Sequence, residues 1–273
     1  FRKKFIIRIG GDPIWERVVE RGKRFISLNK YYKQNLQKID RPWLYHWISY
    51  LIKHSDGIAL YNKMFKDFYI KYFGADPNKI TIIPNPIYAR GEASINLPSE
   101  PVILFAGRFV AYKNLSMVIR EFEQIRKTLG YGRLLLVGHG PDKKSLERQI
   151  IKSPARNNIS IIESLPQEKL FDLIKNSAVA IWPALSEFNP NFILEALSFG
   201  KPVLISRDHG LSTPLPQELE FDPFNEQEFK QKLIWLLNKD NYKKIVEIIS
   251  QLPRNQTWEK VTNSHLKLIS DII

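Results

Sequence analysis

Short apolar runs that fit buried strands alternate with longer amphipathic segments along almost the whole of this chain of 273 residues. In the larger, second part, the expected strands are 102–106, 133–137, 159–162, 178–182 and 202–205. The segments at 114–128, 141–151, 167–176, 226–237 and 241–249 have the apolar spacing of helices. Alternation of this kind is typical of parallel sheets covered by helices, so an α/β fold is predicted.

The first part of the chain shows the same alternation over a shorter length. Strands are expected at 4–9, 57–61 and 80–83, with helices at 12–21, 41–54 and 63–73. A polar, irregular stretch at 88–100 fits a linker before the second part. We therefore predict two Rossmann-like domains that face each other across a cleft, with ligands at the carboxyl ends of the strands. Because Phe1 leads directly into a strand, the first domain, 1–93, is expected to be only partly present.

Composition narrows the class of protein. A hydrophobic content of 44% supports a buried core, and no apolar run approaches the ~18 residues that a membrane-spanning helix needs. The chain has no cysteine, which excludes a disulfide scaffold and a thiolate metal site, and its first residues show no secretory signal pattern. These features fit a cytoplasmic protein.

The net charge of +13 is concentrated in the first part of the chain. Residues 1–90 hold 18 Lys or Arg and 7 Asp or Glu, a balance of +11, and the remaining residues contribute only +2. The same region is rich in aromatic residues. A basic and aromatic surface is typical of nucleic-acid binding, or of an anionic membrane surface that presents a lipid-linked substrate. Ordinary helices with basic outer faces and aromatic cores give the same composition, so all three interpretations stay open.

The segment SEFNPNFILEALSFGKPV, at 186–203, carries two carboxylates with seven residues between them. Glu187 lies in a predicted loop, and Glu195 lies in the second turn of a predicted helix. Asn189 fits the cap of that helix, Pro190 its first position and Gly200 the residue after its end. A glutamate within so apolar a helix needs hydrogen-bond donors, and sugar or ribose hydroxyls are good donors to a carboxylate.

The start of this helix adds a second kind of site. Free backbone N–H groups near Asn191 and Phe192 can hold a phosphate. Hydroxyl acceptors and an anion site on one element are what a nucleotide sugar needs. The same residues also fit a plainer arrangement, in which Glu195 makes a structural salt bridge and Glu187 is a solvated loop residue.

The residues around the two glutamates resemble the C-terminal motif of the family-4, or group 1, retaining glycosyltransferases, which have the GT-B fold. The matching letters are the serine before Glu187, PN before the apolar run, and then EAL, FG and KPV. The resemblance implies that Glu195 binds the nucleotide ribose, and that Glu187 acts as a catalytic carboxylate that binds the donor sugar together with nearby backbone N–H groups. The substrate-binding residues that it implies around this loop are Phe188, Asn189, Pro190, Asn191 and Phe192.

The sequence AGRFVAYKN, which follows the expected strand 102–106, carries two cations. Gly107 allows a tight turn, and Arg108 and Lys113 can reach a diphosphate, although surface loops of many proteins carry such residues. In the resembled family, the corresponding arginine and lysine bind the leaving diphosphate, so both are assigned to catalysis and Gly107 to substrate binding. The family often has Lys-Gly where this chain has Lys113 followed by Asn114.

The sequence VGHGP, at 137–141, lacks the third glycine of a dinucleotide fingerprint, so a redox cofactor is not expected. The resemblance places Gly138 against the nucleotide, and it places backbone contacts to the base at Ser164 and Leu165. His139 fits an exposed loop residue better than a catalytic one.

The sequence RIGGDPIWE, after the first expected strand, resembles a motif variant seen in some members of the family, on the side of the acceptor. Asp12 is grouped with the catalytic residues because it could contact a sugar hydroxyl, but it also fits the cap of the following helix. Asn85 matches a hinge position. Trp258, in the sequence TWE, matches a closing segment, so 256–273 is expected to be a helix that crosses back from the second domain, 94–255, to the first.

The resemblance implies a metal-independent glycosyltransferase that moves a sugar from a nucleotide diphosphate to an acceptor hydroxyl, in glycan, lipopolysaccharide or glycolipid synthesis. Positive side chains would replace a metal at the diphosphate, and no cofactor is expected because the nucleotide sugar is a substrate. We expect a glycan or lipid-linked acceptor and peripheral binding to the inner face of an anionic membrane, without a nucleic-acid partner.

Two other kinds of function stay open. A nucleotide-sugar epimerase or a phosphorylase could share the fold, and the basic first part could belong to a nucleic-acid-binding protein. The base and sugar of the donor, the acceptor and the oligomeric state do not follow from the sequence.

Overall fold

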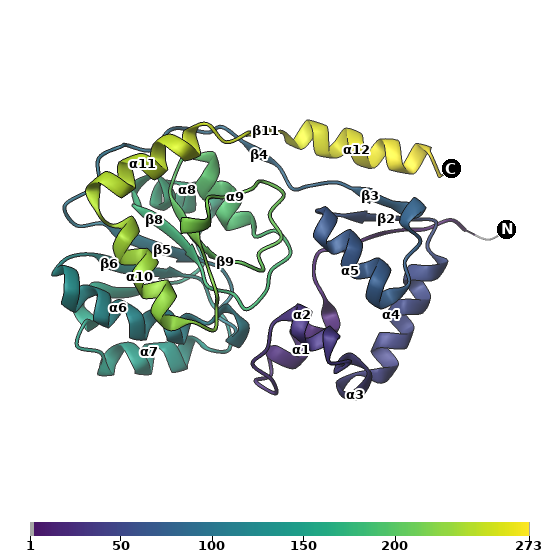
Figure 1. Cartoon of the computed structure of the whole chain (residues 1–273), viewed down its shortest axis with the longest axis horizontal. Coiled ribbons are helices and arrows are strands. Elements are labelled where there is room, and N and C mark those ends of the chain that lie inside the picture. The colour runs from purple at the N-terminus through teal and green to yellow at the C-terminus, as the bar shows by residue number, and fades with distance from the viewer. Residues whose placement is uncertain (1–2, 273) are drawn as a thin grey trace.

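Two α/β domains lie side by side in the computed structural model, which describes residues 3–272 (Figure 1). The first domain holds a three-stranded parallel sheet in the order β1-β2-β3. Its elements are β1 (Ile6–Arg8), α1 (Pro13–Val19), α2 (Leu28–Lys33), α3 (Gln37–Asp40), α4 (Pro42–His54), β2 (Gly57–Leu60), α5 (Lys63–Phe73) and β3 (Ile80–Ile82).

The second domain is built on a six-stranded parallel sheet in the order β10-β9-β8-β5-β6-β7. Its strands are β5 (Val102–Ala106), β6 (Arg133–Val137), β7 (Ile159–Ile162), β8 (Val179–Trp182), β9 (Val203–Ser206) and β10 (Glu220–Phe221). Its helices are α6 (Leu115–Leu129), α7 (Lys143–Lys152), α8 (Gln167–Asn176), α9 (Asn191–Ser198), α10 (Glu226–Leu236) and α11 (Lys239–Ser250). The central strands β8 and β9 are buried along their whole length, as expected for parallel strands with helices on both faces.

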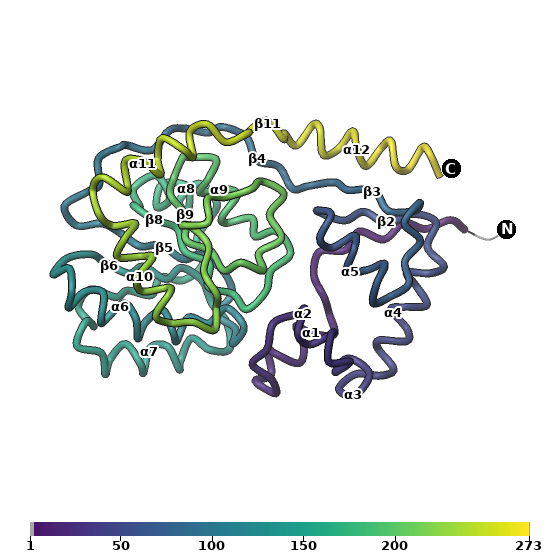
Figure 2. The backbone as a smooth tube through the Cα atoms, viewed as in Figure 1, coloured from purple at the N-terminus to yellow at the C-terminus, as the bar shows by residue number. Residues whose placement is uncertain are grey.

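The last helix returns to the first domain. β4 (Ile87–Tyr88) and β11 (Asn255–Gln256) form an antiparallel pair where the chain crosses between the domains. α12 (Trp258–Ser270) then runs along the first domain, beside β2 and β3 (Figure 2). Its Val261 and Leu268 pack with Ala59 and Ile83 of that domain. The end of the chain is therefore part of the core that supports the three-stranded sheet.

The predicted α/β fold with two Rossmann-like domains is confirmed, and most predicted elements lie within a few residues of the observed ones. Five short α-helices and β-strands were not predicted: α2 with six residues, α3 with four, and β4, β10 and β11 with two each. Their sequences are too short to show an apolar period, and they become regular only because the rest of the fold packs against them.

The helix that carries Glu195 begins one residue later than predicted. α9 starts at Asn191, and Pro190 occupies the cap position with an extended backbone. Asn189 does not cap the helix with its side chain, because its φ of 103° turns the chain through the left-handed region. The predicted end is correct, since Gly200, with a φ of 69°, follows the last residues of the helix.

Two loops of the second domain cross at very short range just beyond the sheet. The backbone N–H of Gly107, after β5, donates to the carbonyl of Val137 at 2.9 Å. Gly138, after β6, has a φ of 145°, and a Cβ atom at this position would lie 1.9 Å from the carbonyl oxygen of Gly107. Glycine is therefore required at Gly138 by the close approach of the two chains.

Replacing Gly138 by alanine should lower the free energy of unfolding by about 2–4 kcal/mol, because backbone atoms must move to admit the new methyl group. Gly130→Ala is the matched control: Gly130 also has a positive φ, of 76°, but no atom lies within 4 Å of its added Cβ. That variant should lose only about 1 kcal/mol. Urea unfolding of both variants measures the difference, and equal losses would contradict the crowding argument.

Candidate functional site

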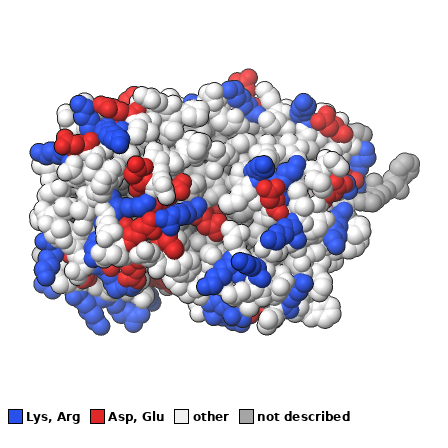
Figure 3. Space-filling model, viewed as in Figure 1, with Lys and Arg blue, Asp and Glu red and all other residues white. Residues whose placement is uncertain are grey.

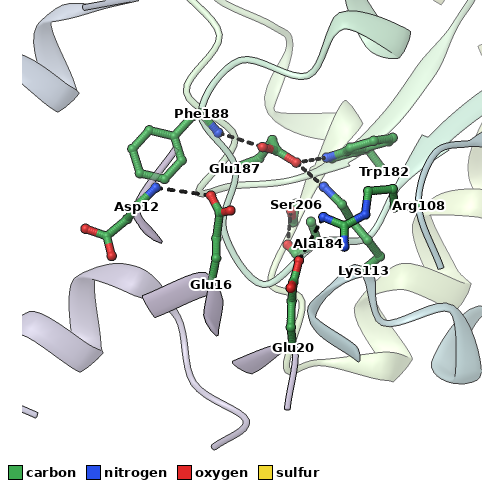
Figure 4. Close-up of polar contacts among 10 residues, drawn as sticks. All are labelled: Asp12, Glu16, Glu20, Arg108, Lys113, Trp182, Ala184, Glu187, Phe188 and Ser206. Carbon is green, nitrogen blue, oxygen red and sulfur yellow. Dashed lines mark hydrogen bonds and ion pairs between the residues drawn. The ribbon is translucent and has the colours of Figure 1, made fainter. Parts of the chain in front are cut away.

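Four of the predicted site residues, Arg108, Lys113, Glu187 and Phe188, lie close together where the second domain faces α1 of the first domain (Figure 4). Gly107, Gly138 and Glu187 follow β5, β6 and β8, so all three lie beyond the carboxyl ends of parallel strands. α1 brings Glu16 and Glu20 to the same region from the other side. The site is therefore shared between the domains.

Lys113 and Glu187 form an ion pair inside this cleft. The lysine is only 5% exposed, and its Nζ atom lies 4.2 Å from the ring centre of Trp182 and 4.6 Å from that of Tyr112. The indole Nε1 of Trp182 also donates to the carboxylate of Glu187, at 3.1 Å. The backbone N–H of Phe188 is a third donor to this carboxylate, at 3.0 Å. Three donors and two aromatic rings thus hold one cation and one carboxylate together in a nearly dry environment.

Arg108 belongs to the second domain, but it forms its ion pair with a residue of the first domain. Its Nη1 atom lies 3.1 Å from Oε1 of Glu20, and the arginine side chain remains 60% exposed. An exposed ion pair of this kind contributes little to stability and is easily exchanged for another anion. Arg108 is therefore held at the mouth of the cleft and stays accessible to a ligand.

Glu16 lies beside the pair of Lys113 and Glu187, next to Asp12 (Figure 4). Its Oε1 atom accepts a hydrogen bond from the backbone N–H of Asp12 at 3.1 Å. Burial, followed by the nearby carboxylates of Glu187 and Asp12, raises the pKa of Glu16 to about 7, against a smaller opposing effect of Lys113. The cleft thus contains a carboxyl group that gains and loses its proton near neutral pH.

Asp12 caps α1 and does not face the cleft. It is fully buried, and its carboxylate accepts hydrogen bonds from the backbone of Ile14 and Trp15 and, at 2.7 Å, from the hydroxyl of Tyr32. Burial raises the pKa of Asp12 to about 6 despite these bonds. Capping is thus the role that the geometry gives Asp12, and its grouping with the catalytic residues is corrected on this ground.

The loop that carries Glu187 is fixed by contacts on both sides. The backbone N–H of Glu187 donates to the carbonyl of Asp208 at 2.7 Å. The hydroxyl of Ser186 donates to the Asp208 carboxylate and accepts, at 2.9 Å, from the backbone N–H of Leu28 in the first domain. Closure of the domains therefore sets the position of this loop.

The residues before and at the start of α9 line a cavity of about 340 Å³. They are Phe188, Asn189, Pro190, Asn191 and Phe192, with Gly10, Tyr61 and Asn85 on the other wall. Phe188 stacks on Phe65 of the first domain with ring centres 4.0 Å apart, and Asn85 donates to the side chain of Asn191 at 2.7 Å. The predicted phosphate site and the predicted hinge residue are thus in contact.

Glu195 faces a separate, smaller cavity of about 110 Å³, which Asn191 also lines. Gln167 donates to its carboxylate at 3.1 Å, and Arg90 and Trp258 lie on the same cavity wall. Burial raises the pKa of Glu195 above its ordinary value, although the hydrogen bond from Gln167 opposes this. No ion pair of Glu195 is found within residues 3–272, so the predicted alternative of a structural salt bridge is not observed.

The residues predicted near the nucleobase lie in the loops after β6 and β7, beyond the carboxyl ends of these strands. Gly138 donates its backbone N–H to Ile162 at 2.9 Å, which joins the loops after β6 and β7. Ser164 is exposed and lies 2.7 Å from Nδ1 of His139, which is also exposed, as predicted. Leu165 is half-buried against the core.

Sequence reasoning missed the acidic side of the cleft. Glu16 belongs to the RIGGDPIWE motif, but no role was predicted for it, and no role was predicted for Glu20. Their spacing of four residues on one expected helix places them on the same face, which was a usable signal. Trp182 and Gln167 had no signal of their own, because both were assigned to ordinary strand and helix positions.

Comparisons with known proteins bear on the family and the fold of the chain. The family model described as "Glycosyl transferases group 1" matches residues 92–251. The sulfoquinovosyl transferase SQD2 of Arabidopsis thaliana is 27% identical over 192 residues, which cover 65% of this chain and 36% of that protein. This chain spans between 36% and 40% of the length of the first curated relatives that it matches.

Solved structures show the same fold at low sequence identity. WaaG, a glycosyltransferase involved in lipopolysaccharide biosynthesis, aligns with a TM-score of 0.68 at 16% identity, over 98% of this chain and 74% of WaaG. The pneumococcal O-GlcNAc transferase GtfA, in complex with UDP and GlcNAc, aligns with a TM-score of 0.66 at 15% identity, over 82% of this chain and 47% of GtfA. Both likenesses concern the GT-B fold.

The raised pKa of Glu16 predicts a pH-dependent stability. Because this pKa is higher in the folded than in the unfolded state, Glu16 favours folding at low pH, and that contribution is lost as the pH rises through about 7. Glu16→Gln keeps the oxygen that accepts from Asp12 but carries no charge. Relative to the unchanged protein, it should gain about 2 kcal/mol between about pH 5.5 and pH 8. Urea unfolding of both proteins at the two pH values measures this difference. An equal change in the free energy of unfolding of the two proteins between these pH values would contradict the assignment.

Proposed function

Because the chain belongs to the glycosyl transferases group 1 family, we propose that it is part of a retaining glycosyltransferase that takes its sugar from a nucleotide diphosphate. The acceptor is a hydroxyl group of a glycan or glycolipid, as in lipopolysaccharide synthesis. One observation carries this proposal. The ion pairs of Arg108 with Glu20 and of Lys113 with Glu187 lie at one interdomain cleft, together with the start of the apolar helix α9.

Each group in the cleft has a part in the proposed reaction. Arg108 and Lys113 stabilise the negative charge that grows on the leaving diphosphate, with the first N–H groups of α9 beside it. Glu187 accepts hydrogen bonds from hydroxyls of the donor sugar, and Glu195 accepts from the ribose. The C1–oxygen bond to the diphosphate breaks while the acceptor oxygen bonds to C1 on the same face, and the acceptor proton passes to the leaving phosphate.

Donor binding must rearrange the ion pairs of the free protein. Lys113 is paired with Glu187 and Arg108 with Glu20, so a diphosphate has to replace a carboxylate at each cation. The cavities beside Glu187 and Glu195, of about 340 and 110 Å³, share Asn191 as a wall. A nucleotide sugar that reaches both glutamates joins these cavities into one site, which requires a small opening of the cleft.

We also propose that the acceptor is met at an anionic membrane surface. The balance of +11 in residues 1–90 supports this, since each Lys or Arg close to an anionic leaflet contributes about 1 kcal/mol of attraction. Within residues 3–272, no helix combines the length and the apolar character needed to cross a bilayer. We propose a peripheral contact, made by the basic surface of the first domain.

A thermal-shift screen with UDP, GDP, ADP and dTDP, and with their sugars, tests the donor site, because a bound ligand raises the melting temperature. Arg108→Ala and Glu195→Ala should each weaken binding of the best nucleotide by about 10- to 100-fold, since each removes a charge-assisted hydrogen bond. Lys113→Ala is a poorer test, because it leaves the Glu187 carboxylate without its cation and destabilises the fold.

Arg120→Ala is the control for this experiment. Arg120 is an exposed arginine on α6 that pairs with Glu226, away from the cleft, and its loss should leave nucleotide binding unchanged. Wild-type binding by either site variant would show that the site is misassigned. Binding of RNA or DNA with no shift from any nucleotide sugar would instead favour the nucleic-acid alternative.

A further inference from the structure

The outer face of α4, in the first domain, exposes large aromatic side chains to solvent. Trp43 is 87% exposed, Trp47 60% and Tyr50 54%. We call these three residues the aromatic stripe. Ile39, in the preceding helix α3, is 69% exposed. Single exposed apolar residues are common on protein surfaces, but several on one face of one helix indicate a binding surface.

The spacing of the aromatic stripe places it on one side of the helix. Residues four and seven positions after Trp43 lie on the same face at about 100° per residue. The rings of Trp47 and Tyr50 stack, with centres 6.2 Å apart and an interplanar angle of 17°. These two rings therefore form a continuous surface, and Trp43 lies one turn before them on the same face of the helix.

The stripe is not needed to hold α4 in place. The opposite side of the helix packs into the domain through Ile52, which is 2% exposed, and through Leu44, Tyr45 and Ile48. The hydroxyl of Tyr45 donates to the carbonyl of Tyr72 at 2.6 Å. Since these contacts anchor the helix, its exposed aromatic rings are available for a partner.

The charges around the stripe indicate which partner it suits. Residues 30–54 hold five Lys or Arg and a single acidic residue, Asp40, which is neutralised by Arg24. In Figure 3, the side of the molecule that carries the first domain shows more Lys and Arg than Asp and Glu. Tryptophan and tyrosine favour the boundary between lipid headgroups and acyl chains, and basic residues favour anionic headgroups.

We propose that the aromatic stripe of α4 inserts into the headgroup region of an anionic bilayer, with Lys38 and Lys53 at its two ends contacting lipid phosphates. Ile39 extends the inserted surface. This inference rests on the proposed membrane contact. It assigns that contact to one face of α4 rather than to the overall charge of the first domain. It also fixes the orientation of the protein, since α4 lies parallel to the bilayer surface.

The test measures co-sedimentation of the protein with vesicles of phosphatidylcholine alone and of phosphatidylcholine with phosphatidylglycerol. The triple variant Trp43→Ala, Trp47→Ala, Tyr50→Ala removes the stripe, and alanine at exposed helix positions keeps α4 helical. Its partition to anionic vesicles should fall at least about tenfold. Ile151→Ala, at a 67% exposed position on α7 of the second domain, is the control and should bind as the unchanged protein does.

Three results would overturn the inference. Equal vesicle binding by the triple variant would leave a membrane contact that does not use the stripe. Failure of the unchanged protein to bind anionic vesicles at low salt would remove both the stripe and the membrane contact. A dimer that the triple variant converts to a monomer, without vesicle binding, would make the stripe a self-association surface. The nucleotide-induced melting shift of each protein is measured in parallel and reports on the donor site independently.

Discussion

The ion pair of Lys113 and Glu187 is the interaction on which the arrangement of the cleft depends. The lysine lies between two aromatic rings, and its partner sits on a loop that contacts the first domain. A cation so deeply buried is costly unless a carboxylate accompanies it. The pair therefore fixes the loop after β8 against the turn after β5, and this fixes the positions of the proposed phosphate site and the proposed sugar site relative to each other.

Helix α1 adds an acidic face to this cleft and links closure to ligand binding. Glu20 forms an ion pair with Arg108. Glu16 lies close enough to Glu187 for the charge of Glu187 to help raise the pKa of Glu16. The free protein thus satisfies its cations with carboxylates of its own. A diphosphate offers the same charge with more oxygens, so it can replace these carboxylates when the domains separate slightly. In the proposed function, the first domain therefore competes with the donor before it presents the acceptor.

Much of this arrangement could be predicted because it follows from strand order. In a parallel sheet, residues that follow successive strands meet at one edge, so Gly107, Gly138 and Glu187 could be placed together from sequence alone. The ion-pair partners of the cations could not be predicted in this way. Lys113 is 74 residues from Glu187, and Arg108 is 88 residues from Glu20, so both pairs depend on how the chain packs. The left-handed backbone of Asn189 was missed because the loop, and not local preference, imposes it.

The affinity of the Glu20→Gln variant for a nucleoside diphosphate tests this account most directly. The nucleotide that gives the largest melting shift is titrated calorimetrically into the unchanged protein and into the variant. If Glu20 competes for Arg108, removing its charge should tighten binding by roughly three- to tenfold, the size expected for an exposed ion pair. The gain should vanish when Arg108 is replaced by alanine in the same protein. Unchanged or weaker binding by Glu20→Gln would contradict the proposal that the diphosphate takes the place of this carboxylate.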